Sequence, residues 1–309
     1  MPDSSKKAKS RNPLLIPLIV ACALVLALSC VYIVQYYKSQ GNIENTNRRL
    51  IDLFVTPAPT AEPAEATYAE ATAMEATPVQ PEPTRQTTPD ENTYIVTFAT
   101  PPASISPEFD ALYRINPDIV GHLSVPSTTT PIDLFVVQRD NDYYLTHDFY
   151  GEPSKGGTLF LDHSNAIWPQ DQHLLIYGHN MKNGTMFARL TKYKSIEYAT
   201  RNPFVYFDTL YEKGAYTVVA ALRMTAKDTQ TEEFNLRTFA FGEASFDAFI
   251  YRVLNNALYI TNAGVENSDQ LLTLVTCSYS EDDERFILLT RKLREGETEE
   301  DVLNLIGSK

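Results

Sequence analysis

A run of 21 residues without a charged side chain, Leu14 to Val34, most constrains how this chain can fold. About 20 apolar residues suffice for a helix to span a bilayer. Four basic residues and one acidic residue precede the run. Because the basic flank of a membrane helix stays in the cytoplasm, we expect residues 1–13 to be a cytoplasmic tail and residues 14–37 a transmembrane anchor. The rest of the chain then lies outside the cell, attached to the membrane through this helix.

Two alternatives to an uncleaved anchor remain open. A cleaved signal peptide has a shorter apolar core and a cleavage site of small residues. The stretch Ala27-Leu28-Ser29-Cys30 also looks loosely like a lipidation box. However, the apolar run continues to Val34 beyond this cysteine, which favours the anchor and leaves lipidation of Cys30 as a minor alternative.

The composition changes again between the anchor and residue 93. Residues 38–55 show a weak helical pattern that suits a juxtamembrane helix. Residues 56–92 consist largely of Thr, Pro, Ala and Glu, with seven prolines, seven acids and one base. Such a segment cannot bury a core. We therefore expect residues 38–92 to be a juxtamembrane segment and a disordered stalk that holds a domain away from the membrane.

Residues 93–309 have the composition of one globular domain of 217 residues. Short apolar runs separated by turn residues predict a barrel or a sandwich. The expected strands are Ile119–Val125, Ile132–Gln138, Tyr143–Thr146, Thr158–Asp162, His173–Tyr177, Phe204–Asp208, Tyr216–Leu222, Leu271–Thr276 and Phe286–Leu289. The expected helices are Ser106–Ile115, Thr185–Ala199 and Ala244–Leu258. The sequence thus predicts a mostly-β domain with helical insertions.

The net charge of −13 argues against a nucleic-acid partner, which would require a basic face. The acids are spread along the chain, so a solvated acidic surface is the simpler interpretation. Histidine and cysteine spacings typical of zinc sites do not occur in the sequence, and neither do glycine-rich phosphate loops. We therefore expect no metal site and no cofactor.

Cys277 is the one cysteine outside the N-terminal apolar run. Without a partner for an intramolecular disulfide, it is either a buried, inert residue or a reactive thiol. It ends an apolar strand, a polar loop follows, and Arg285 begins the next apolar run. If the two runs pair as a hairpin, a thiol and a guanidinium share one end of a sheet. That arrangement suits attack by sulfur on a carbonyl carbon while the cation holds the oxyanion.

Among five histidines, His179 is the best candidate for a catalytic base. It follows an apolar strand directly, after Gly178, which lets the backbone turn, and it precedes an asparagine-rich turn. We expect such a histidine to project into a groove. A turn histidine with satisfied hydrogen bonds is the alternative. The residues alone thus give Cys277, His179 and Arg285 as a candidate catalytic group.

Several blocks of the chain resemble the sortases, the membrane-anchored cysteine transpeptidases of Gram-positive bacteria. Thr273-Leu274-Val275-Thr276-Cys277, followed eight positions later by Arg285, is similar to their TLxTC…R signature. Tyr177-Gly178-His179-Asn180-Met181 is similar to their histidine motif. Further blocks, including 116–121, 157–162 and 202–208, resemble class B members in particular, as does a helix before the cysteine strand. The resemblance covers nearly all of residues 116–293, with small departures such as Val275 in the signature.

The resemblance implies a closed β-barrel of about eight strands with N-terminal and inserted helices over residues 93–309. It implies that Cys277 attacks the threonine carbonyl of a sorting signal on a secreted surface protein, and that Arg285 stabilises the oxyanion. His179 then protonates the leaving amine, and an amino group of a peptidoglycan precursor, or another cell-wall amine, resolves the thioacyl enzyme. No metal is required. The residues near this group that are expected to bind substrate are Tyr177, Asn180, Thr276 and Ser278.

Three other functions remain open from the sequence. A cysteine peptidase would hydrolyse the acyl intermediate, and only a transpeptidase would ligate an added amine. A pilin polymerase would use a lysine of another protein as the acceptor. A catalytically inactive, anchored binding module would keep Cys277 buried, and rapid alkylation of the native thiol would argue against it.

Overall fold

The computed structural model describes residues 15–55, 102, 104–127, 131–231, 234–277 and 284–307. For residues 15, 16, 19, 35–42 and 277 the backbone alone is described.

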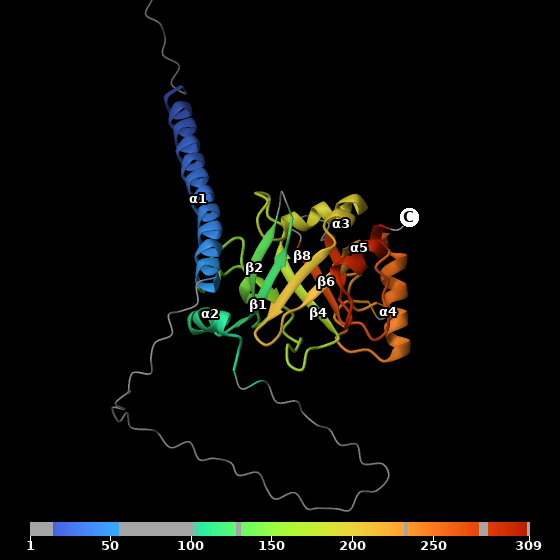
Figure 1. Ribbon diagram of the computed structural model, residues 1–309. Coiled ribbons are helices and arrows are strands. Elements are labelled where there is room, and N and C mark those ends of the chain that lie inside the picture. Colours follow the sequence, from blue (N-terminus) through green and yellow to red (C-terminus); the bar gives the residue numbers. More distant parts are fainter. Residues whose placement is uncertain are drawn as a thin grey trace, which may run out of the picture.

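Eight strands form a closed barrel (Figure 1). They follow the order β5-β1-β2-β3-β4-β8-β9-β6, and the pairing of β5 with β6 closes the ring. Their bounds are β1 (Ile119–Val125), β2 (Ile132–Val137), β3 (Leu159–Leu161), β4 (His173–His179), β5 (Phe204–Thr209), β6 (Ala215–Thr225), β8 (Leu271–Cys277) and β9 (Glu284–Lys292). A ninth strand, β7 (Ala257–Ile260), pairs with β6 outside the ring. The prediction of a mostly-β barrel of about eight strands is confirmed.

Helix α4 (Glu243–Asn255) explains why the strands near it read as continuous apolar runs. Leu272 and Leu274 of β8 belong to the cluster inside the barrel. Leu271 and Val275 of the same strand belong instead to a second cluster, into which α4 inserts its apolar side chains. A strand buried on both faces requires apolar residues at consecutive positions. In Figure 1, α4 covers the side of the barrel opposite α1.

The predicted helices are only partly confirmed. The first is a 3₁₀ turn, η1 (Pro107–Phe109), followed by α2 (Asp110–Ile115). The second is a 3₁₀ helix, η3 (Phe187–Lys194), followed by α3 (Ile196–Arg201). The third, α4, ends at Asn255, three residues before the predicted end, because the chain turns at Asn256 and then enters β7.

The prediction of a strand over Tyr143–Thr146 is wrong. These residues form a 3₁₀ helix, η2 (Tyr143–Leu145). The carboxylate of Asp140 accepts hydrogen bonds from the amides of Asp142 at 2.9 Å and Tyr143 at 2.6 Å. A local turn of this kind overrides the strand preference of two adjacent tyrosines. The C-terminal helix α5 (Glu299–Gly307) was not predicted.

Helix α1 (Leu15–Val55) joins the predicted anchor and the predicted juxtamembrane helix in one helix of 41 residues. Among the residues that the structure describes, no helix combines the length and the apolar character needed to cross a membrane. The anchor at 14–37 stays a prediction, as do its two alternatives. The cytoplasmic tail over 1–13 and the stalk over 56–92 lie outside the described residues.

The C-terminal half of α1 packs against the barrel, whereas its N-terminal half projects beyond it (Figure 1). Ile43 and Leu50 are buried in this contact. The ring of Phe54 lies 5.1 Å from that of Phe109 and 5.4 Å from that of Phe135, measured between centroids. The folded unit therefore includes the end of α1, and Phe54 lies beside Phe109 although more than 50 residues separate them in the sequence.

His173, at the start of β4, is fully buried beside α4. Its Nδ1 lies 2.8 Å from the carbonyl oxygen of Thr238, and its Nε2 lies 2.8 Å from Oγ1 of Thr273. A neutral ring satisfies both contacts by donating from Nδ1 and accepting at Nε2. Burial lowers the pKa of His173 to about 4, although the contact with Thr238 opposes this shift.

We expect His173 alone to lower the free energy of unfolding by about 2 kcal/mol between pH 7 and pH 5. In the unfolded chain the imidazole takes up a proton near its ordinary pKa of 6.5, whereas the folded ring stays neutral to about 4. Lower pH therefore favours the unfolded state across this window. Urea unfolding of the wild type and of His173→Gln at both pH values measures the effect. An equal pH dependence in the two proteins would contradict it.

Candidate active site

A groove of about 400 Å³ opens beside the ends of β4, β8 and β9. Its lining residues are Asn141, Asp142, Leu145, Phe160, Tyr177, His179, Thr229, Gln230, Leu236, Arg237, Val275 and Arg285. Two of the three predicted catalytic residues, His179 and Arg285, are among them. The third, Cys277, follows Val275 by two residues on β8.

The strand register brings the three predicted residues together. Strands β4 and β8 are parallel, and His179 is the Cα partner of Cys277. Strands β8 and β9 are antiparallel, with Val275 opposite Ile287, so the predicted hairpin is confirmed. The same register, continued by two residues on each strand, sets residue 277 opposite Arg285. Adjacent strands lie about 4.8 Å apart. The backbones of His179, Cys277 and Arg285 thus meet at one edge of the barrel.

The ring of His179 is held against η2. Its Nε2 lies 2.7 Å from the carbonyl oxygen of Leu145, and the residue is only 9% exposed. Desolvation lowers the pKa of His179 below its ordinary value of 6.5, although the contact with Leu145 opposes this shift. The ring is therefore predominantly neutral at pH 7.

Gly178 is needed for close packing and not for the turn that the sequence suggested. It lies inside β4, and its neighbour His179 is still part of the strand. A Cβ atom at position 178 would lie 2.3 Å from Cδ2 of Leu159 and 2.7 Å from the ring of Phe187. Any larger residue at this position would therefore clash with Leu159 and Phe187 unless these side chains moved.

The predicted substrate-binding residues occupy different positions. Tyr177 lines the groove. Asn180 is exposed, directly after β4. Thr276 is buried, and its Oγ1 accepts a hydrogen bond from the amide of Phe286 at 2.9 Å, which ties β8 to β9. Ser278 lies outside the described residues. The role of these residues in binding stays a prediction.

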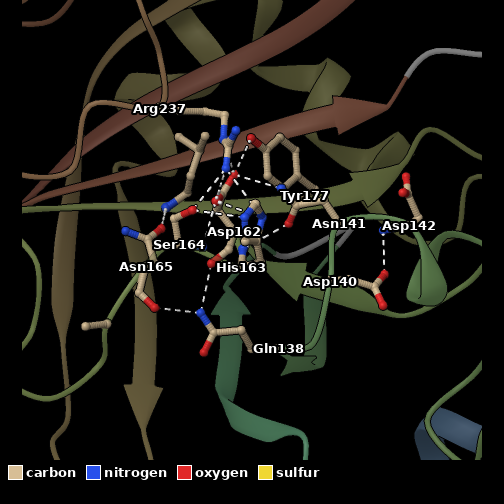
Figure 2. A network of polar contacts seen from close by, with 12 residues as sticks. Gln138, Asp140, Asn141, Asp142, Asp162, His163, Ser164, Asn165, Tyr177 and Arg237 are labelled. Carbon is tan, nitrogen blue, oxygen red and sulfur yellow. Dashed lines mark hydrogen bonds and ion pairs between the residues drawn. The ribbon is translucent and has the colours of Figure 1, made fainter.

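Asp162 and Arg237, which sequence reasoning missed, form the centre of a polar network beside the groove (Figure 2). Arg237 donates to the carboxylate of Asp162 from Nε at 2.7 Å and from Nη2 at 2.9 Å. Burial raises the pKa of Asp162, but the hydrogen bonds from Arg237, the amide of Ser164 and Tyr177, together with the charge of Arg237, outweigh it, so this pKa lies below its ordinary value. Asp162 is therefore a carboxylate at neutral pH.

A second hollow, of about 280 Å³, lies between α1 and the barrel. Ile43 and Leu50 line it from α1, and Phe149 and Met186 line it from the barrel side. Neither a cysteine nor a histidine occurs among its lining residues. The groove beside His179 is therefore the better candidate for an active site.

Comparison with known proteins gives a consistent result. Residues 123–292 match the Sortase domain family. The chain is 32% identical over 182 residues to Sortase B of Listeria monocytogenes. The matched residues make up 58% of this chain and 70% of that protein. A solved Staphylococcus aureus sortase B–substrate complex is similar, with a TM-score of 0.56 and 27% identity over 62% of this chain and 87% of that one. Clostridium perfringens sortase B gives a TM-score of 0.54 and 29% identity over 60% and 98%. The region that matches the family contains the groove and residues 179, 277 and 285.

Proposed function

Because this chain belongs to the sortase family, class B, whose members are cysteine transpeptidases, we propose that it cleaves a C-terminal sorting signal of secreted proteins and transfers them to a cell-wall amine. The observation that carries this proposal is the register that sets Cys277 beside His179 and opposite Arg285. A groove of about 400 Å³ next to them offers room for a short extended peptide.

The reactive form of the pair is the minor one at pH 7, in which Cys277 is a thiolate and His179 an imidazolium. In the first half-reaction, this thiolate attacks the carbonyl carbon of the scissile bond. A C–S bond forms, and the carbonyl oxygen becomes an oxyanion that the Arg285 guanidinium stabilises. As the tetrahedral intermediate collapses, the C–N bond breaks and the leaving nitrogen takes a proton from the His179 imidazolium. A thioester between Cys277 and the secreted protein remains.

In the second half-reaction, an amine of a cell-wall precursor attacks the thioester carbon. Neutral His179 accepts a proton from the attacking nitrogen, and the C–S bond breaks. The products are a new amide, a Cys277 thiolate and a His179 imidazolium, so the enzyme returns to its starting charge state. Water in place of the amine would make the enzyme a peptidase, and a protein lysine would make it a pilin polymerase.

We expect the acid limb of the pH profile of kcat/KM to lie below pH 6.5. The reacting cysteine–histidine pair carries one proton, and a second proton stops the reaction. The pKa at which the pair takes up this second proton is lowered because His179 is desolvated. Leu145→Ala, which shortens a groove side chain next to the ring, should admit water and move this limb upward. Ligation of a fluorescent peptide between pH 4 and pH 9 measures both profiles. A wild-type acid limb at or above pH 6.5 would contradict the expectation.

We also propose that residues 14–37 anchor the enzyme in the cell membrane, with the N-terminus in the cytoplasm and the barrel outside. The uncharged run Leu14–Val34 supports this, as do apolar side chains on α1 such as Leu26 and Leu28, which are 66% and 69% exposed. Fractionation of cells, together with protease digestion of intact protoplasts, tests it. Recovery of the full-length protein in the soluble fraction, or protection of the barrel from external protease, would refute it.

The full-length protein in detergent micelles provides the test of the reaction. It would be incubated with sorting-signal peptides of the LPxTG and NPxTx types, together with oligoglycine, a diaminopimelate-containing muropeptide or a lysine peptide. Mass spectrometry would follow cleaved and ligated products. Ligation to a wall-type amine supports the proposal, whereas ligation to the lysine peptide alone points to a pilin polymerase. Cleavage without ligation points to a peptidase. No cleavage, together with a native Cys277 that resists alkylation, leaves the binding module.

A further inference from the structure

One wall of the groove belongs to residues 234–241, here called the wall segment, which lead into α4. Leu236 and Arg237 face the groove from this segment. Phe234, Phe239 and Phe241 pack in the apolar cluster under α4. The wall segment has no regular helix or strand of its own, so its position depends on contacts with the barrel.

Contacts at two places hold the wall segment to the barrel. Beneath the groove wall, the carbonyl oxygen of Thr238 lies 2.8 Å from Nδ1 of His173, and the amide of His173 donates to the carbonyl oxygen of Phe239 at 3.1 Å. At the groove, the Arg237 guanidinium forms a two-point ion pair with Asp162, which follows β3, and donates from Nη2 to the hydroxyl of Ser164 at 3.2 Å (Figure 2). The side chain of Asp162 is fully buried and that of Arg237 is 31% exposed. The ion pair therefore joins a buried position at the end of β3 to the groove surface.

Asp162 also contacts the other walls of the groove. Its Oδ2 accepts hydrogen bonds from the hydroxyl of Tyr177 and from Nδ2 of Asn141, both at 3.1 Å. Tyr177, Asn141 and Arg237 all line the groove, and they come from β4, the loop after β2 and the wall segment. Figure 2 shows these side chains converging on one carboxylate. Tyr177 precedes His179 by two residues, so both lie on the same face of β4.

We propose that Asp162 is a positioning residue, which fixes the spacing between Arg237 on the wall segment and Tyr177 on β4 and thereby sets the width of the groove that takes the substrate peptide. A buried carboxylate needs several donors to offset its lost hydration. The donors that surround Asp162 are mainly groove residues, so the ionised group and the groove geometry depend on each other. The inference rests on the proposed function, because it assigns the peptide to this groove.

The chain offers a matched control for the ion pair. Arg294 donates to Asp269 from Nε at 2.8 Å and from Nη2 at 2.9 Å. The side chains of Arg294 and Asp269 are 32% and 2% exposed, nearly the same values as in the groove pair. Asp269 precedes β8 and Arg294 follows β9, so this pair lies at the opposite end of these strands from Cys277 and Arg285. Breaking the Arg294–Asp269 pair therefore shows how the loss of a buried ion pair away from the groove affects KM and hydrogen exchange.

The kinetic test compares Arg237→Gln and Asp162→Asn with Arg294→Gln in the full-length protein. We expect KM for the sorting peptide to rise roughly tenfold in the first two variants, the scale of one lost charge-assisted contact, with kcat within about twofold of the wild type. In the double variant Arg237→Gln/Asp162→Asn, KM should rise no more than in Arg237→Gln alone, because both partners of the pair are then neutral. Arg294→Gln should leave KM unchanged. An unchanged KM in Arg237→Gln, or an equal rise in Arg294→Gln, would overturn the proposal.

Hydrogen exchange gives a readout that requires no substrate. We expect amides of the wall segment to exchange roughly tenfold faster in Arg237→Gln than in the wild type, and to be unaffected by Arg294→Gln. If the wild type cleaves no peptide, the proposed function fails while the exchange rates still report whether Asp162 fixes the wall segment. Unchanged exchange overturns the positioning role even in an active enzyme. Faster exchange with an unchanged KM also overturns it, because the pair is then only structural.

Discussion

Replacing Cys277 with alanine is expected to lower the rate of peptide ligation by about 10⁴-fold or more, because no other group can form the covalent intermediate. Peptide affinity should change by no more than about twofold, since the groove walls from Tyr177 to Arg237 remain in place. Single-turnover ligation followed by mass spectrometry, with binding measured by fluorescence anisotropy, separates the two effects. The thioester adduct seen in the wild type should be missing from the variant.

Two further cysteines provide the control for this substitution. Cys22 and Cys30 lie exposed on α1, far along the chain from the groove. The double variant Cys22→Ala/Cys30→Ala should retain full activity and a single alkylation site at Cys277. Ligation by Cys277→Ala at more than about one hundredth of the wild-type rate would mean that another group is the nucleophile.

Replacing Arg291 with leucine is expected to lower the free energy of unfolding by about 3–5 kcal/mol, the usual cost of breaking a buried ion pair. Arg291, on β9, is fully buried. It donates to the carboxylate of Glu297 at 2.6 and 2.7 Å, to the carbonyl oxygen of Ala263 at 2.8 Å and to that of Gly264 at 2.9 Å. The leucine removes these hydrogen bonds, and Glu297 keeps one from the amide of Arg294 at 2.9 Å. Urea unfolding monitored by circular dichroism measures the loss.

A second substitution separates two contributions to this loss of stability, that of the unpaired charge on Glu297 and that of the lost packing of Arg291. The hydrogen bond from Arg291 holds the pKa of Glu297 below its ordinary value, although burial opposes this shift. In the double variant Arg291→Leu/Glu297→Gln no charge is left unpaired, so we expect it to be more stable than Arg291→Leu by at least about 1 kcal/mol. A loss below about 1 kcal/mol in Arg291→Leu would show that the pair contributes little to the fold.

The sequence predicted the barrel strands well where their pattern reflects burial on two faces. Leu271–Thr276 reads as a strand because it packs inside the barrel on one face and under α4 on the other. The pattern failed where local chemistry decides the conformation. Asp140 turns the chain into η2 at two tyrosines with strand preference, and Leu258 continues the helical spacing of α4 although it lies in β7.

The same contrast applies to the site. His179 and Cys277 end apolar strands and Arg285 lies at the start of another, so their meeting at one edge could be predicted from a hairpin and a motif. The Asp162–Arg237 pair could not, because 75 positions separate its members and no periodic pattern marks either of them. The two residues meet because the segment after β6 crosses to β4 and the end of β3, and β3 lies opposite β6 in the ring of strands. A contact made by such a long connection has no signature in a local stretch of sequence.

The contact between Phe54 and Phe109 limits the role of the long segment between them in setting how far the barrel lies from the start of α1. Both ends of this segment are fixed on the same surface of the barrel, so its contour length does not set the distance from the barrel to the start of α1. That distance is limited by the helix itself, 41 residues long, or about 60 Å. Insertions or deletions between residues 56 and 92 should thus leave this distance unchanged, because α1 sets it.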